Sequence, residues 1–270
     1  MKQLLLGTPL GRGAMLLRDT FSIARMALVS PEEVGTLAND QLASHLITKI
    51  CKPNGTFIDI GAHIGSIIAD VHCNDPSIRI MAIEAVPEKA QNLRRKFPFI
   101  ELHNCAVGET TGEMSFFVNT RRSGYSSLGR PSSIDTESTL QTTVQVEKLD
   151  NLVSSTNVDA IKIDVEGAEL GVLRGGIDTL RKYRPILMFE SGPQADDGLG
   201  YSKEAIYDFL ISQDYSVFVP NRVAHNGDGL TLTGFIDSHI FPRRTTNYFA
   251  IPTERRMEYM QRARSILRIV

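Results

Sequence analysis

The chain has 270 residues, of which 42% are hydrophobic and 22% are charged. It is too apolar for a disordered chain, and it is long enough to bury a core without a disulfide or a structural metal. Lys plus Arg number 29 and Asp plus Glu number 31, so the formal net charge is −2, and no overall positive field is available to gather nucleic acid.

Residues 1–50 are predicted to form a mainly helical N-terminal extension. The residues at 52–55, which include Pro and Gly, are predicted to form a turn that ends this extension. After them, short apolar runs alternate with amphipathic segments. Strands are predicted at 56–60, 78–84, 99–103, 159–164, 185–190, 215–219 and 247–251. Helices are predicted from near residue 63 to 71, and at 87–97, 170–180 and 203–212. This alternation predicts an α/β fold with a mostly parallel, doubly wound sheet.

Residues 113–147 interrupt that alternation. Two extended runs, 113–119 and 142–147, flank a long polar segment. Such an excursion is either a functional loop or an ordinary solvated loop, and the sequence leaves both open. On the functional interpretation, Ser123, Tyr125 and Ser126 would contact a polyhydroxyl or carboxylate-bearing substrate, because they offer hydrogen-bond donors and an aromatic face.

The strongest local motif is FIDIGAHIG, at residues 57–65. A predicted strand ends here in Asp59 and Ile60, and Gly61 and Gly65 bracket a turn into a helix. Glycines suit a position where the backbone turns sharply and a ligand comes close. Ligands of open α/β sheets bind at the carboxyl ends of strands. The turn is therefore a candidate cofactor site, and Ala62 and His63 lie within it.

Glu84 ends the next predicted strand, 23 positions after Gly61. A carboxylate at this place can accept hydrogen bonds from both ribose hydroxyls. The turn lacks the middle glycine of G-x-G-x-x-G, which argues against close approach of a pyrophosphate. S-adenosylmethionine has no phosphate, and Asp59 would face its ammonium directly or through water. The pattern therefore favours this cofactor over a nicotinamide dinucleotide.

These residues resemble the FkbM-type S-adenosylmethionine-dependent methyltransferases, over roughly residues 55–252. The resemblance rests on pieces that occur in order along the chain. They are FIDIGAHIG, IMAIEAVPEKAQNLRRKF, NCAVGETTGEMSFF, VQVEKLDNL, IKIDVEGAELGVLRGG, ILMFE and NYFAIP. The resemblance implies a Rossmann-like methyltransferase domain at 51–252, between the extension at 1–50 and a C-terminal helix at 253–270.

The resemblance also implies residue roles. Gly61 and Gly65 would line the methionyl part of the cofactor, and Glu84 would bind the ribose. Asp164 would face the sulfonium and the acceptor. The residues implied near the adenine are Asn104, Cys105 and Ala106. His63 and Ala85 stand where the family commonly has Asn and Pro, which leaves their individual cofactor contacts open.

The stretch IKIDVEGAE places three acids around a strand-to-helix turn: Asp164, Glu166 and Glu169. Three interpretations stay open. Glu166 and Glu169 could complement a helix N-terminus, Asp164 and Glu166 could orient an acceptor hydroxyl with one of them as general base, or Asp164 and Glu166 could hold a divalent metal. The metal is the least favoured, because no histidine accompanies the acids.

The remaining features suggest partners and compartment. Cys51, Cys73 and Cys105 form no CxxC pair, which favours reduced thiols and a cytoplasmic protein. The N-terminal apolar run is too short for a signal peptide, and no apolar stretch is long enough for a transmembrane segment. The basic C-terminal segment is predicted to pack or to form a homodimer, rather than to lie on a membrane or a polyanion.

The sequence thus predicts methylation of a hydroxyl oxygen on a sugar, glycan or small-molecule natural product. Oxygen is favoured because carboxylates follow the fourth strand, where an asparagine-proline-aromatic box would favour another acceptor atom. The O-methylation of glycans and natural products is itself an implication of the resemblance. Two alternatives are a nicotinamide-dependent oxidoreductase and a non-catalytic cofactor-binding scaffold.

Overall fold

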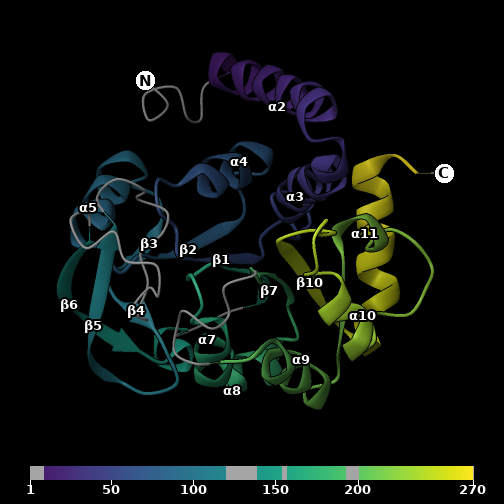
Figure 1. Ribbon diagram of the computed structural model, residues 1–270. Coiled ribbons are helices and arrows are strands. Elements are labelled where there is room, and N and C mark those ends of the chain that lie inside the picture. The colour runs from purple at the N-terminus through teal and green to yellow at the C-terminus, as the bar shows by residue number, and fades with distance from the viewer. Residues whose placement is uncertain (1–8, 120–138, 154–156, 193–200, 270) are drawn as a thin grey trace.

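Figure 1 shows a computed structural model of the chain, which describes residues 9–119, 139–153, 157–192 and 201–269. At its centre is a seven-stranded sheet of order β3-β2-β1-β7-β8-β10-β9. Its strands are β1 (Thr56–Ile60), β2 (Arg79–Ile83), β3 (Glu101–His103), β7 (Val158–Ile163), β8 (Ile186–Glu190), β9 (Tyr215–Phe218) and β10 (Asn247–Pro252). Neighbouring strands from β3 to β8 are parallel, and β10 is antiparallel to both of its neighbours. The mostly parallel α/β fold is confirmed.

Helices cover both faces of this sheet (Figure 1). One face carries α3 (Val34–Ile47), α4 (Ser66–Asn74), α5 (Pro87–Lys96) and α11 (Arg256–Leu267), and the other carries α6 (Leu149–Leu152), α7 (Glu169–Gly175), α8 (Ile177–Tyr183), α9 (Lys203–Ser212) and α10 (Leu232–Asp237). Each face has its own apolar cluster: Leu46, Ile68 and Tyr259 belong to the first, and Leu173 and Leu210 to the second. The doubly wound arrangement follows from this double burial.

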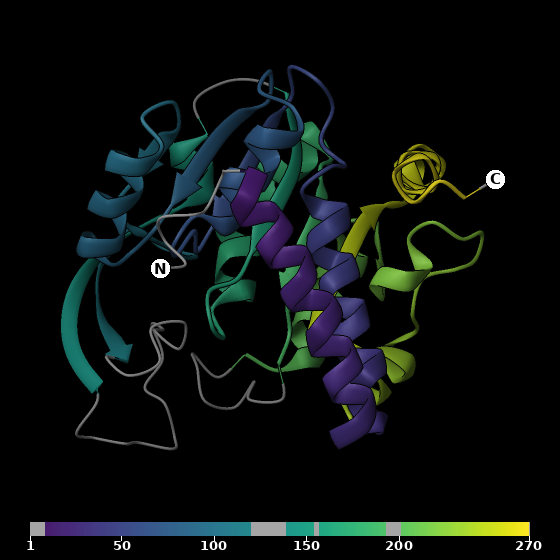
Figure 2. The same cartoon turned by 90° about the horizontal axis from the view of Figure 1, so that it is seen from above.

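The N-terminal helices are α2 (Pro9–Val29) and α3, joined by the short 3₁₀ turn Pro31–Glu33. They lie side by side in both views (Figures 1 and 2), so that α3 separates α2 from the sheet. At the other end, Tyr259 of α11 is fully buried and Arg262 donates to Asp159 at 2.6 Å. The helical extension is thus present, whereas the division into three domains stays a prediction. Within the described part of the chain, no helix is both long and apolar enough to cross a membrane.

Strand order reverses between β1 and β7. From β1 the chain adds β2 and β3 on one side, and it later returns to add β7 and β8 on the other. The carboxyl ends of β1, β2 and β7 therefore surround a crevice, the place where open α/β sheets bind their ligands.

The excursion at 113–147 forms a second, three-stranded sheet of order β4-β6-β5. Its strands are β4 (Ala106–Val107), β5 (Gly112–Asn119) and β6 (Thr139–Glu147), and β5 and β6 are antiparallel. Phe116 and Val144 form a small apolar cluster with Val86 and Ala168, which follow β2 and β7. The two predicted extended runs thus pack beside the crevice. Ser123, Tyr125 and Ser126 lie outside the described residues, so their predicted substrate contact stays a prediction.

Two predicted helices differ from the structure. The helix expected from near His63 begins at Ser66, because His63 (φ 50°) and Gly65 (φ 78°) have left-handed backbones that belong to the turn. The helix expected over 170–180 is two helices, α7 and α8, which meet at Gly176. Close packing against Gly108 and Leu149 accompanies this break.

Gly175→Ala is expected to destabilise the fold by about 1–3 kcal/mol. A Cβ at Gly175 would lie 2.0 Å from the carbonyl oxygen of Gly108, a backbone atom that cannot rotate away. Urea unfolding measures the loss. The matched control is Gly35→Ala inside α3, where a Cβ meets nothing within 4 Å. It is expected to gain about 0.5–1 kcal/mol. Equal stability of the two variants would contradict the close approach.

Candidate active site

A pocket of about 330 Å³ opens in the crevice between β1, β2 and β7. Its walls combine acids, lysines, glycine backbone and apolar side chains. The lining residues from the strand ends and turns are Asp59, Ile60, Gly61, Ala62, His63, Ile83, Glu84, Ala85, Cys105, Ala106, Val107, Asp164, Val165 and Glu166, and other elements add Ser44, Ile64, Ser66, Ile67, Lys89, Phe116, Lys162, Met188 and Asn247. The volume and the mixed lining suit a small organic ligand.

The glycine turn is fastened to the end of β2 by backbone hydrogen bonds. The N–H groups of Gly61 and Ala62 both donate to the carbonyl of Ile83, at 3.0 and 3.1 Å. The N–H of His63 donates to Oε2 of Glu84 at 2.8 Å, and the N–H of Val86 donates to Oε1 at 2.9 Å. Glu84 is thus held rigidly between the turn and the start of α5. Each of its oxygens keeps a further lone pair, so it can still accept from a ligand hydroxyl.

Most of the predicted cofactor residues meet at the pocket, and two lie just behind it. The amide of Asn104 donates to the carbonyl of Glu84 at 2.8 Å and thereby holds the end of β2. At Gly65, a Cβ would lie 2.3 Å from the ring of Phe97, so α5 packs where any side chain would stand. Neither residue lines the pocket. Asn104 supports the end of β2, and the absence of a side chain at Gly65 lets Phe97 pack closely against the turn. Direct cofactor contact by either residue stays a prediction.

The ends of β1 and β7 share a buried lysine. Lys162 Nζ lies 3.2 Å from Asp59 Oδ1 and 3.1 Å from Asp164 Oδ2. It also donates to the carbonyl of Gly61 at 3.0 Å. Burial opposes a charged ammonium, yet the charges of Asp164 and Asp59 raise the pKa of Lys162 above its ordinary value. The lysine therefore stays protonated among these acceptors.

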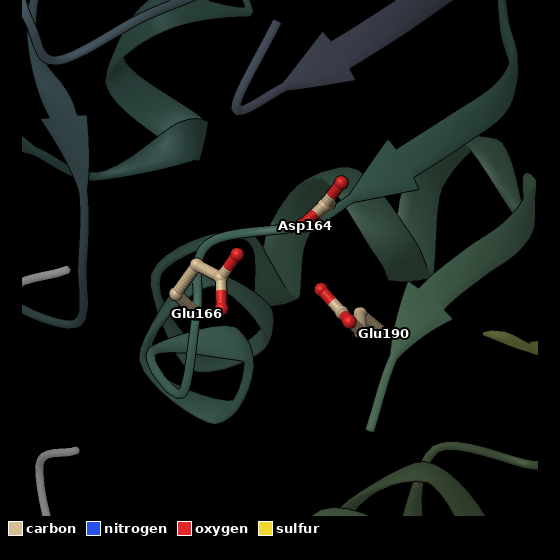
Figure 3. A group of neighbouring side chains, drawn as sticks. All are labelled: Asp164, Glu166 and Glu190. Atoms are coloured by element: carbon tan, nitrogen blue, oxygen red, sulfur yellow. The ribbon is translucent and has the colours of Figure 1, made fainter. Parts of the chain in front are cut away.

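Three acids from two strand ends form a group beside the pocket (Figure 3). Asp164 and Glu166 follow β7, and Glu190 ends β8. Each offers an oxygen, and these oxygens all lie within 4.8 Å of one another. Sequence reasoning missed Glu190, because its partners come from a different strand more than twenty residues earlier in the chain.

Asp164 and Glu190 are hydrogen-bonded through their carboxyl groups, so this pair must share a proton. Although burial opposes it, the ammonium of Lys162 and the hydrogen bond from Glu190 lower the pKa of Asp164. Burial and the charge of Asp164 raise the pKa of Glu190 well above its ordinary range. These shifts favour the proton on Glu190 and the negative charge on Asp164. A divalent metal at Asp164 and Glu166 stays an untested alternative.

Glu166 and Glu169 separate into different roles. Glu169 accepts from the backbone N–H groups of Val165 and Gly167, at 3.1 Å each, so it holds the turn before α7. Glu166 lines the pocket and has a left-handed backbone (φ 54°). Burial, together with the charges of Asp164 and Glu169, raises the pKa of Glu166 to about 7. A carboxyl group with this pKa can exchange a proton near neutral pH.

Other pocket residues carry no distinctive sequence signal. Lys89 in α5 and Phe116 in β5 reach the pocket from elements that pack beside the strand ends. Ser44 of α3 and Asn247 of β10 close it from the N-terminal and C-terminal parts of the chain. Since each is isolated in the sequence, their convergence is known only from the fold.

The pocket fits an adenosine cofactor with a positively charged sulfur. Glu84 can accept from ribose hydroxyls, and Ala106, Val107 and Phe116 supply an apolar wall. The acids that follow β7 line the same pocket and place negative charge in it. A backbone with φ 79° at Gly61 lets the turn lie flat against the end of β7, where a Cβ would meet the Asp164 carbonyl at 1.9 Å. The fold, the turn and the acids are all present in one crevice.

Comparison with known proteins identifies the family. A family model described as the methyltransferase FkbM domain matches residues 59–217, more than half of the chain. The chain belongs to the FkbM methyltransferase family. The cofactor of this family is S-adenosyl-L-methionine, which agrees with the pocket and disfavours the nicotinamide alternative.

Individual relatives are distant. Methyltransferase 1 of Beauveria bassiana (strain ARSEF 2860) is 25% identical over 147 residues, and the match covers 46% of this chain and 59% of that protein. An FkbM methyltransferase from Methylobacillus flagellatus KT is 18% identical, with a TM-score of 0.46, and covers 88% of this chain and 60% of that one. Aeropyrum pernix fibrillarin, solved with natively bound S-adenosyl-L-methionine, is 11% identical, with a TM-score of 0.41 and coverage of 78% and 74%. The chain thus spans less than two thirds of the length of the first two relatives.

Proposed function

We propose that this FkbM-family protein transfers a methyl group from S-adenosyl-L-methionine to a hydroxyl oxygen of a sugar, a glycan or a small natural product. The observation that carries the proposal is the position of Glu166, which lines the pocket with a carboxyl oxygen within 4.8 Å of one from Asp164. Burial, together with the charges of Asp164 and Glu169, raises the pKa of this carboxyl group to about 7. A hydroxyl acceptor must lose its proton as it is methylated, and Glu166 can accept that proton near neutral pH.

The cofactor, when bound, supplies an electrophilic methyl group on a positively charged sulfur. The residues of the chain have three tasks. Glu84 would hold the ribose and the Gly61 turn the methionyl part of the cofactor, Asp164 would face the sulfonium beside the acceptor, and Glu166 would accept the hydrogen bond of the acceptor hydroxyl and take its proton. A new oxygen–carbon bond forms as the sulfur–carbon bond breaks, so alignment of these atoms provides much of the rate.

A labelled-methyl screen tests the proposal. The protein is incubated with S-adenosyl-L-methionine carrying a labelled methyl group and a panel of sugars, oligosaccharides and hydroxylated small molecules. Label is expected in an ether linkage of at least one acceptor, with one S-adenosylhomocysteine formed per transfer. Label on nitrogen or carbon would contradict the oxygen assignment. A protein that binds neither the cofactor nor its product would contradict the whole proposal.

Glu190 provides a further test of the acid group. Glu190→Gln is expected to keep the transfer rate within about threefold, because the amide N–H₂ can still donate to Asp164. Glu190→Ala removes that donor to a charged acceptor and is expected to lower the rate by about tenfold or more. Both are measured as kcat on the acceptor found by the screen. Loss of activity in Glu190→Gln, together with a dependence on added Mg²⁺, would favour the metal alternative instead.

A further inference from the structure

Lys162 connects parts of the site that are far apart in the sequence. Its side chain is 7% exposed, and its ammonium has three N–H groups and three oxygen neighbours. These are Asp59 at the end of β1, the Gly61 carbonyl in the turn and Asp164 after β7. The ammonium thus donates a hydrogen bond to the Gly61 carbonyl and forms ion pairs with both carboxyl groups.

The strands themselves put the lysine there. In the parallel pair β1–β7, Lys162 is the register partner of Asp59. Asp164 follows two residues later and so points to the same face of the sheet. A shorter side chain at position 162 could not reach all three oxygens, and a side chain without charge would leave two carboxyl groups uncompensated.

The glycine turn and the end of β7 are also in direct backbone contact. The N–H of Asp164 donates to the carbonyl of Ile60 at 3.1 Å. The turn at Gly61 passes so close to the Asp164 carbonyl that any side chain there would overlap it. A displacement of the turn would therefore displace Asp164. Lys162 contacts both the turn and Asp164, so it can hold the two in place.

Asp59 has almost no exposed surface in the pocket in which the cofactor would lie. It borders the pocket but is only 1% exposed, and the ammonium of Lys162 lies against its Oδ1. Burial raises the pKa of Asp59, and the ammonium of Lys162 is the neighbour that opposes this rise and favours the carboxylate. Direct contact with a cofactor ammonium would require the Asp59 carboxyl group to become more exposed than it is here.

We propose that Lys162 is a positioning residue that locks the Gly61 turn to Asp164, and that Asp59 acts as its buried counter-ion rather than as a direct cofactor ligand. The proposal rests on the proposed function, since it assigns how the cofactor side and the acceptor side of that site are held in register. It predicts that stability and cofactor binding depend on these two residues in different ways.

Three variants of the full chain separate the roles: Asp59→Asn, Lys162→Met and the double variant Asp59→Asn/Lys162→Met. Lys162→Met alone is expected to be strongly destabilised, because it leaves the buried Asp59 carboxyl without its cation. The double variant removes both charges and is expected to recover a melting temperature close to that of Asp59→Asn. This recovery makes binding measurable even if the single lysine variant does not fold.

Calorimetric titration with S-adenosyl-L-methionine and with S-adenosylhomocysteine then reads out positioning. Asp59→Asn, in which Lys162 still holds Gly61 and Asp164, is expected to bind both within about threefold of the wild-type protein. The double variant is expected to bind at least about tenfold more weakly despite its recovered stability. The matched control is Lys96→Met, which removes a largely buried ammonium outside the pocket and should leave binding unchanged.

Two results would overturn the proposal. A stable double variant that binds like the wild-type protein would reduce Lys162 to a structural residue. An Asp59→Asn variant that loses binding as severely as the double variant would make Asp59 a cofactor ligand. Failure of the wild-type protein to bind the cofactor is a separate outcome, because it overturns the proposed function itself.

Discussion

Glu166→Gln is expected to lower the kcat of methyl transfer by about 10²–10⁴-fold, the usual contribution of a positioned general base. The glutamine has nearly the same shape but cannot accept the proton of the acceptor hydroxyl. Cofactor binding, measured by calorimetry, is expected to change little, since Glu84 and the glycine turn are untouched. The matched control is Glu88→Gln, an exposed acid at the start of α5 outside the pocket.

The pH dependence of the same reaction gives an independent readout. Burial, with the charges of Asp164 and Glu169, raises the pKa of Glu166 to about 7. A base must be ionised to act, so kcat is expected to rise with pH through about 7 and to fall off below it. This rise should disappear in Glu166→Gln. A glutamine variant with normal kcat and an unchanged pH profile would instead support the interpretation of Glu166 as a helix-terminus acid.

Glu84→Ala is expected to weaken binding of S-adenosyl-L-methionine by about 10²-fold. The change removes the proposed acceptor for the ribose hydroxyls. It also leaves the N–H groups of His63 and Val86 without the carboxylate oxygens to which they donate, so the turn itself loses support. Calorimetry measures the dissociation constant directly.

Two comparisons sharpen that experiment. Glu84→Gln keeps one acceptor oxygen and should bind more tightly than Glu84→Ala. Glu101→Ala on the neighbouring strand β3 removes an exposed acid that contacts His103 and does not line the pocket, and it should bind like the wild-type protein. Binding by Glu84→Ala within about twofold of the wild-type value would contradict the assigned role.

The sequence determined the elements that depend on nearby residues. Apolar runs bounded by turn residues predicted the strands of the central sheet, and their alternation with helices predicted parallel pairing. Gly61 and Glu84 could be related to each other because both end neighbouring strands of one β-α-β unit, in which spacing along the chain maps onto position in space.

The local geometry of the turn was not determined in this way. The helix expected near His63 starts later because His63 and Gly65 have left-handed backbones in the turn, which the contact of the His63 N–H with Glu84 fastens in place. The break between α7 and α8 accompanies the approach of Gly175 to Gly108, residues that are 67 positions apart. In both places a contact made by the folded chain changed what local propensity favoured.

The electrostatics of the site belong to the tertiary structure as well. Lys162 and Asp164 belong to one sequence motif, IKIDVEGAE. Asp59 comes close to them only through the β1–β7 register, and Glu190 only through the pairing of β7 with β8. The sequence alone thus determined the fold class and, together with the family resemblance, the cofactor class, and it predicted Asp164 and Glu166 but not Glu190 as site acids. The folded structure raises the pKa of Glu190, lowers that of Asp164 and places Asp59 against Lys162. The sequence alone could not show this, because burial and the distance between charges arise only when separate strands pack together.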